Sequence, residues 1–261
     1  MKKRTISAII LLLILILSLI INPKIFGLVM GVVSIIGFNE ILLIKYNDKI
    51  KKLKFIRLLG IISLLLIVFN KTFYKIDISV IILLPLFILS LPIIFYNDKD
   101  KYNIEDYFYI LGSIYLIGLA FQNIIYLSNS SISKMIFIFI ISFITDTYAY
   151  IGGLLIGRHK LTEISPKKTI EGSIVGTIMG VIVGSVYYIN VIGRISLIDT
   201  IILCLILTIV SEIGDLLFSS IKRYYNKKDY SDLIPGHGGI LDRFDSVIYV
   251  SLCLSILLKI I

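Results

Sequence analysis

Long apolar runs recur from one end of this chain to the other, and only short polar stretches separate them. An α-helix needs about 20 apolar residues to cross a hydrocarbon core about 30 Å thick, because each backbone group must be hydrogen-bonded within the helix. The 57% share of hydrophobic residues and the mean hydropathy of +0.98 exceed what soluble domains show. The sequence therefore predicts an all-α fold, a polytopic membrane helical bundle.

The apolar runs predict nine transmembrane helices. We place them at 5–22, 25–44, 55–70, 78–96, 107–127, 134–156, 173–193, 197–218 and 245–261. The short connections predict a single integral membrane domain over 1–261, with scaffold helices in 1–130 and catalytic helices and cytoplasmic loops in 131–261. The first run follows Lys2-Lys3-Arg4 as in a signal peptide, but it is as long as a span and no small-residue cleavage site follows it. We therefore expect it to be retained as a helix.

Basic residues divide unevenly between the two sides of this topology. Of the 26 lysines and arginines, six fall opposite the amino terminus and twenty on its side. The six are Lys24, Lys71, Lys75, Lys134, Arg194 and Lys259. Because cytoplasmic loops retain Lys and Arg, we expect a multi-pass protein of the cell membrane whose amino terminus faces the cytoplasm. The net charge of +9 then belongs to loops at the lipid surface, which argues against a nucleic-acid partner.

Carboxylates gather near the cytoplasmic ends of the last two predicted helices. Asp215, Ser219 and Lys222 share one helix face, and Asp242 and Asp245 are three residues apart. An acid inside a membrane helix indicates either a functional site or an ion pair with Lys or Arg. Oxygen ligands without clustered histidines suit Mg²⁺, whereas helix capping is the alternative for the later pair. Neither cysteine, Cys204 nor Cys253, lies in a spaced polar cluster, so a disulfide framework or a zinc site is not expected.

The loop before the last helix, within the predicted cytoplasmic loop 219–244, contains Pro235-Gly236-His237-Gly238-Gly239. Such a turn is poor in side chains and lets backbone N–H groups approach a phosphate closely. Arg243 and Lys222 would bind the remaining phosphate charge. His237 suits either phosphate contact or packing of the turn, and a multi-histidine metal centre is not expected because His159 is the only other histidine.

The other predicted cytoplasmic loop, 157–172, carries two adjacent lysines. Lys167 and Lys168 follow a proline and precede Thr169, which can cap the next helix. They suit an anionic headgroup or a triphosphate, and an ordinary basic loop is the alternative. In the next helix, glycines recur every four residues and predict close packing against another helix. They are Gly172, Gly176, Gly180 and Gly184.

The stretch from Ser219 to Asp245 resembles the signature of the phosphatidate cytidylyltransferase family, also called CDP-diacylglycerol synthases. The matching residues are Ser219-Ser220-Ile221-Lys222-Arg223, Lys228-Asp229 and the run from Pro235 to Asp245. Gly214-Asp215 and the blocks 146–153 and 165–172 also resemble that family. The resemblance covers about 140–250, while the first third of the chain resembles the family only in being membranous. No role is carried over to Glu212 from the resemblance.

The resemblance implies a homodimer with an Mg²⁺-dependent site, in a polar cavity open to the cytoplasm and the bilayer. Asp215, Asp242 and Asp245 match acidic metal-binding and catalytic positions, while Lys222 and Ser219 match substrate-binding ones. We expect Lys222 to act in catalysis as well. K⁺ is suggested as a second ion by the resemblance alone. Further substrate-binding candidates are Asp146, Lys167, Lys168, Arg223, His237, Gly238, Gly239 and Arg243.

The expected reaction joins CTP and phosphatidic acid into CDP-diacylglycerol and pyrophosphate, in phospholipid biosynthesis. The nearest alternative is a CTP-dependent kinase of a membrane polyprenol or a similar lipid alcohol. Another alternative is an ion-coupled transporter, but its acids should lie near the middle of the membrane in repeated, broken helices. The acids of this chain gather instead at one end of one half of the predicted bundle.

Overall fold

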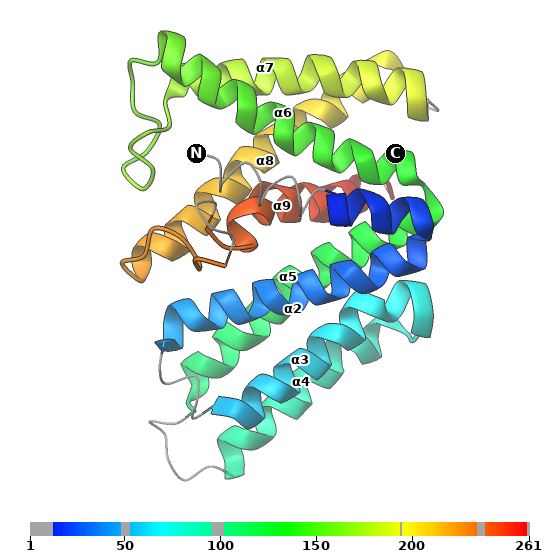
Figure 1. Cartoon of the computed structure of the whole chain (residues 1–261), viewed down its shortest axis with the longest axis vertical. Coiled ribbons are helices and arrows are strands. Elements are labelled where there is room, and N and C mark those ends of the chain that lie inside the picture. Colours follow the sequence, from blue (N-terminus) through cyan, green and yellow to red (C-terminus); the bar gives the residue numbers. More distant parts are fainter. Residues whose placement is uncertain (1–12, 48–52, 96–101, 194, 234–237, 260–261) are drawn as a thin grey trace. The chain divides into compact units, whose positions relative to one another are not determined.

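The computed structural model describes residues 13–47, 53–95, 102–193, 195–233 and 238–259. Within them, residues 13–21 are helical and the other helices follow in chain order (Figure 1). These are α2 (Pro23–Tyr46), α3 (Lys54–Phe69), α4 (Ile78–Phe95), α5 (Ile104–Ser130), α6 (Ile132–Ile156), α7 (Ile170–Tyr187), α8 (Leu197–Tyr224) and α9 (Leu241–Leu257). Asn70–Tyr74 and Tyr188–Ile192 continue α3 and α7 as π-helical turns. No β-strand forms among the described residues beyond one isolated bridge, Lys160 with Thr169.

Seven helices in the described ranges, α2 to α8, have the length and hydropathy to cross a membrane. The prediction of an all-α polytopic membrane protein is confirmed. The predicted first span lies partly outside the described residues. Helix α9 has 17 residues, whereas each of those seven has at least 18 when α3 and α7 are counted with their π-helical turns. Both therefore stay predicted spans.

The end of α8 differs most from the prediction, because the helix continues to Tyr224 instead of ending at residue 218. Arg223 stabilises this end by donating from Nη1 to the carbonyl oxygen of Lys227 at 2.9 Å. Asn226 then adopts a left-handed backbone conformation with φ of 55°, which is a common way to end a helix. Ser219 and Lys222 therefore lie on the helix that carries Asp215, and the predicted loop 219–244 begins later than expected.

The chain forms two compact units. The first unit contains the residues up to Ser130 together with 229–242, and the second contains 131–228 together with the residues from Arg243 onward. In the first unit, α5 packs against α2 and α3, and α4 packs against α3. Its interior is apolar, with Phe38, Leu64 and Phe121 fully buried.

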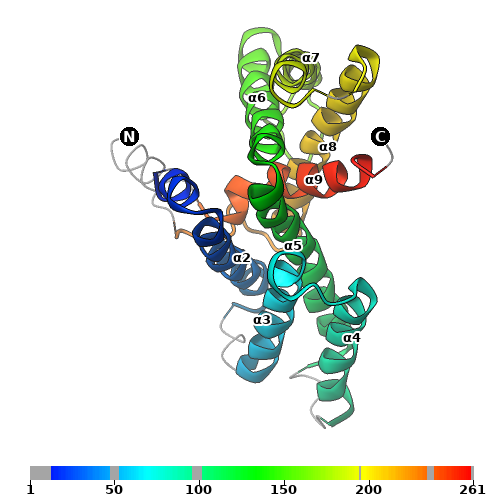
Figure 2. The same cartoon turned by 90° about the vertical axis from the view of Figure 1, so that its right-hand side faces the viewer.

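In the second unit, α7 packs against both α6 and α8 (Figure 2). The predicted glycine stripe explains this close approach. A Cβ at Gly176 would lie 2.7 Å from the carbonyl oxygen of Thr145 in α6, and one at Gly180 would lie 2.6 Å from the methyl group of Thr208 in α8. The prediction of close helix packing is confirmed, and it brings the polar ends of three helices together.

Candidate active site

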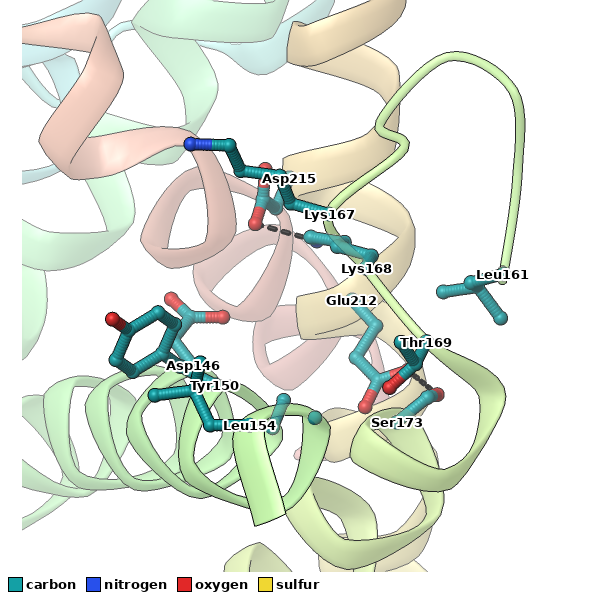
Figure 3. A pocket seen from close by; sticks show the side chains of 12 residues that line it. Asp146, Tyr150, Leu154, Leu161, Lys167, Lys168, Thr169, Ser173, Glu212 and Asp215 are labelled. Carbon is teal, nitrogen blue, oxygen red and sulfur yellow. Dashed lines mark hydrogen bonds and ion pairs between the residues drawn. The ribbon is translucent and has the colours of Figure 1, made fainter. Parts of the chain in front are cut away.

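A cavity of about 550 Å³ opens in the second unit where α6, α7 and α8 meet the loop that follows α6 (Figure 3). Cavities of this size are typical of small-molecule sites. Its charged and hydroxyl lining comes from four chain segments. The residues are Asp146 and Tyr150 from α6, Lys167, Lys168 and Thr169 from the loop, Ser173 from α7, and Glu212 and Asp215 from α8.

Asp215 and Lys168 form an ion pair in the wall of this cavity, with 2.5 Å between Oδ2 and Nζ. The hydroxyl of Ser219, one turn later on α8, donates to the other carboxylate oxygen at 3.3 Å. The ion pair that the sequence left as an alternative is therefore present. However, the Asp215 and Lys168 side chains keep 24% and 27% of their surface exposed. An ion pair that water reaches is weak, so either partner can exchange it for a ligand at small cost.

Glu212 is a site residue that sequence reasoning missed. It accepts hydrogen bonds from the hydroxyl of Ser173 and, at 3.4 Å, from that of Thr177. The charges of Lys168 and Asp215 also act on its carboxylate. Ser173 and Thr177 are four residues apart in α7, among the glycines of the stripe, and this pairing of hydroxyls was the available signal.

Ser246, in the second turn of α9, links Asp146 to Asp245. The hydroxyl of Ser246 donates to Asp146 Oδ2 at 2.9 Å, and the backbone N–H of Ser246 donates to Asp245 Oδ1 at 2.9 Å. Asp245 is repelled by the charges of Asp215 and Asp146 and attracted by that of Lys222. Three aspartates from α6, α8 and α9 therefore lie within electrostatic range of one another in the second unit. In the ranges that the structure covers, no three His, Cys, Asp or Glu side chains stand close enough to hold a metal ion by themselves.

Asp242 belongs to the first unit, where it bonds to the backbone on either side of the residues that the structure does not describe. Its Oδ2 accepts from the backbone N–H of Tyr230 at 2.9 Å and from that of Gly239 at 2.8 Å. Gly238 has φ of 81°, and a Cβ there would lie 2.7 Å from the same oxygen, so the turn requires glycine. Both donors precede the start of α9, so these bonds hold the segment before the helix, and the capping and metal-binding roles of Asp242 stay predictions. His237 lies outside the described residues.

Three of the remaining predicted binders lie at exposed positions and one is buried. Arg223 and Arg243 are exposed near the end of α8 and the start of α9, and Arg223 bonds to the Lys227 carbonyl oxygen described above. Lys167 is exposed at the cavity. Lys222, in contrast, is almost fully buried in the last turns of α8. The structure thus brings together Asp146, Lys168, Asp215, Ser219, Lys222 and Asp245 in one unit, while Gly238, Gly239 and Asp242 belong to the other.

The fold and the cavity define a polytopic membrane protein with a charged cavity large enough for a ligand. The sequence profile of the cytidylyltransferase family matches residues 2–261, and the chain belongs to that family. Its membership makes the chain a nucleotidyltransferase.

Full-length relatives support the same assignment. Phosphatidate cytidylyltransferases of Staphylococcus saprophyticus, Staphylococcus haemolyticus and Staphylococcus epidermidis are 34%, 33% and 32% identical to this chain over 266 residues. Each comparison covers 99% of this chain and 99% of the relative. The resemblance inferred from the stretch between Ser219 and Asp245 is confirmed over the whole chain.

Proposed function

We propose that this chain transfers the cytidylyl group of CTP to phosphatidic acid, forming CDP-diacylglycerol and pyrophosphate for phospholipid biosynthesis. The observation that carries the proposal is the cavity whose wall contains Lys168 and Asp215, built between helices long enough to span a membrane. Family membership and the activity for which the relatives are named support the same reaction.

The reaction asks for charge neutralisation and alignment more than for a strong base. An oxygen of the phosphatidate phosphate forms a bond to the α-phosphorus of CTP. The bond from that phosphorus to the bridging oxygen breaks, and its electron pair leaves with pyrophosphate. The attacking phosphate is already ionised at neutral pH, so holding two polyanions in line is the main task. Lys168, Lys222 and Arg243 are the cations that we assign to the phosphate oxygens.

Binding of the remaining substrate groups is assigned to residues around the cavity and the glycine-rich turn. Ser219 is bonded to Asp215, and Asp146 and Lys167 line the cavity. Arg223, Gly238 and Gly239 stay substrate-binding predictions, as does His237. Backbone N–H groups of the turn are the donors expected to approach the phosphates.

The carboxylates of this chain fit Mg²⁺ in their chemistry. Asp215 and Asp245 supply only oxygen donors, and Mg²⁺ in nucleotide sites keeps several waters and takes one or two protein carboxylates plus substrate phosphates. Asp242, one helical turn before Asp245 in α9, is the predicted third ligand. When bound, the ion would offset the charge of the triphosphate. A second ion, K⁺, is an expectation that rests on the resemblance.

Asp242→Asn tests the metal assignment. We expect it to abolish turnover while the protein stays folded, because the Asn oxygen still accepts the two backbone hydrogen bonds but carries no charge for Mg²⁺. Chelation of Mg²⁺ should abolish turnover of the wild-type protein and added Mg²⁺ should restore it. Full activity of Asp242→Asn would remove Asp242 from the ligand set.

We also place the active end of the protein at the cytoplasmic face of the cell membrane, in a homodimer. The support for the orientation is the uneven division of Lys and Arg between the two sides of the helices. Accessibility of single cysteines introduced at positions 167 and 75 would test it, since the first should react from the cytoplasmic side and the second from the other.

Product analysis separates the proposed reaction from the CTP-dependent kinase. Purified protein in detergent is supplied with phosphatidic acid, a polyprenol, CTP and Mg²⁺. The proposal predicts equal amounts of pyrophosphate and CDP-diacylglycerol. Release of CDP together with a phosphorylated polyprenol would establish the kinase instead.

A further inference from the structure

Glu40 is a carboxylate that the first unit buries in α2, with 2% of its surface exposed. Taking a carboxylate out of water costs several kcal/mol unless hydrogen bonds compensate for the lost hydration. The partners that compensate Glu40 lie in the segment 229–242 of the same unit. This segment contains the glycine-rich turn.

Three hydrogen bonds join Glu40 to that segment. Oε1 accepts from the hydroxyl of Ser231 at 2.6 Å and from the backbone N–H of Ile240 at 2.9 Å. Oε2 accepts from the backbone N–H of Leu241 at 2.8 Å. These N–H groups lie at the start of α9, where helices leave donors unpaired, so a negative charge is favourable there.

The atoms around the Glu40 carboxylate are closely packed. A Cβ at Gly239 would lie 2.6 Å from Glu40 Oε1, so the backbone of the turn touches the carboxylate directly. On the same face of α2, a Cβ at Gly37 would lie 3.0 Å from Leu241 Cδ2. Polar and apolar contacts therefore hold Gly239, Ile240 and Leu241 against α2.

Asp242, the next residue, accepts from the backbone N–H of Gly239, the residue that touches Glu40. Glu40 fixes residues 240 and 241, and Asp242 fixes residue 239. A change in the Glu40 bonds would therefore turn both the Gly238–Gly239 backbone and the Asp242 side chain.

We propose that Glu40 is a positioning residue for cytidylyl transfer, which orients the Gly238–Gly239 backbone and Asp242 for the reaction. This inference rests on the proposed function. The reaction is sensitive to such orientation, since a displacement of about 1 Å can cost about 10²-fold in rate. Glu40 acts through the turn and needs no contact with either substrate.

Glu40→Gln is the primary test, because the amide keeps the shape of the side chain but turns one acceptor into a donor. We expect kcat for CDP-diacylglycerol formation to fall about 10²-fold, while KM for phosphatidic acid changes less than 2-fold. Hydrogen exchange at the Ile240 and Leu241 amides should accelerate about 10-fold or more, a readout that does not depend on activity.

Asp106→Asn is the matched control. Asp106 is also an acid buried in the first unit, but it bonds to Tyr46 and Lys45 of α2 and not to the turn. The Asp106→Asn variant should have a lower thermal stability than the wild type, and its kcat should stay within about 2-fold of the wild-type value. If Glu40→Gln and Asp106→Asn reduce kcat in proportion to their loss of stability, Glu40 has only a structural role and the proposal is overturned.

Ser231→Ala removes a single donor, and it serves if Glu40→Gln does not fold. We expect it to lower kcat about 3-fold and to accelerate exchange at Ile240, because it removes one of the three hydrogen bonds to Glu40. Unchanged exchange and unchanged kcat would overturn the proposal. A wild-type protein that makes no CDP-diacylglycerol removes the proposed function itself, whereas an active wild type with a fully active Glu40→Gln removes only the role of Glu40.

Discussion

The two units of this molecule neutralise their acids in different ways. In the first unit, Glu40 accepts from a hydroxyl and two backbone N–H groups, and Asp106 accepts from a tyrosine and pairs with a lysine; both acids are buried. In the second unit, Asp215 and Glu212 line a cavity, and the partner of Asp215 is a lysine that keeps a quarter of its surface exposed.

This difference distinguishes acids that hold the fold from acids that are free to take part in a reaction. A closed carboxylate with fixed donors holds a backbone in place, and removing a partner leaves an uncompensated charge. A carboxylate beside a cavity can give up its lysine to a polyanionic ligand, because both side chains are already partly exposed. We therefore expect changes at the buried acids Glu40 and Asp106 to act mainly on orientation or stability, and changes at the Asp215–Lys168 pair beside the cavity to act mainly on chemistry.

Among the variants that test this difference, Asp215→Asn should show the largest fall in turnover. We expect turnover to fall by at least about 10³-fold, since the variant loses a carboxylate proposed to bind Mg²⁺ and leaves Lys168 without its partner. The thermal midpoint should change little, because the exposed ion pair contributes at most about 1 kcal/mol. Liponucleotide formation and thermal unfolding in detergent measure the two effects. An Asp215→Asn protein that turns over normally contradicts the assignment of chemistry to the second unit.

Lys168→Met should have the next largest effect. The variant keeps an unbranched side chain but cannot bind a phosphate oxygen, and we expect kcat/KM for CTP to fall about 10- to 100-fold. Steady-state kinetics at varied CTP concentration measure this change. Lys160→Met, at an exposed position of the same loop, is the control and should change kcat/KM less than 2-fold. Equal losses in the two variants would show that Lys168 acts only through the general charge of the loop.

Gly176→Ala should have the smallest effect on rate and a clear effect on stability. The added Cβ would lie 2.7 Å from a backbone oxygen of α6, so α6 and α7 must separate, at a cost of about 1–3 kcal/mol. Gly112→Ala in α5 of the first unit is the matched control, since no atom lies within 4 Å of the added Cβ. Thermal unfolding should show a lower midpoint for the first variant alone. Equal midpoints would mean that the glycine stripe is not needed for packing.

Much of the fold was predictable because the membrane imposes a length on every apolar run. The predicted span 134–156 and the observed Ile132–Ile156 differ by two residues at one end. Hydropathy could not predict the end of α8, because its last residues are polar and are stabilised by local bonds such as that of Arg223 with Lys227. Hydropathy marks where a helix leaves the lipid and not where its hydrogen bonds end.

The candidate site was predictable only in part. Asp146, Lys168 and Asp215 follow from acids and lysines next to apolar runs, and the structure places all three at one cavity. The role of Glu40 was not visible, because Ser231 and Leu241 are 191 and 201 positions away in the chain. Sequence spacing relates neighbours within one helix, but partners in distant segments are set by tertiary packing.

The most direct test of the central claim is an experimental structure of the protein with a non-reactive CTP analogue and Mg²⁺. Our account predicts that the triphosphate lies in the cavity of the second unit, with its oxygens beside Lys168 in place of the Asp215 carboxylate. A nucleotide bound elsewhere, with the bond between Lys168 and Asp215 intact, would contradict it.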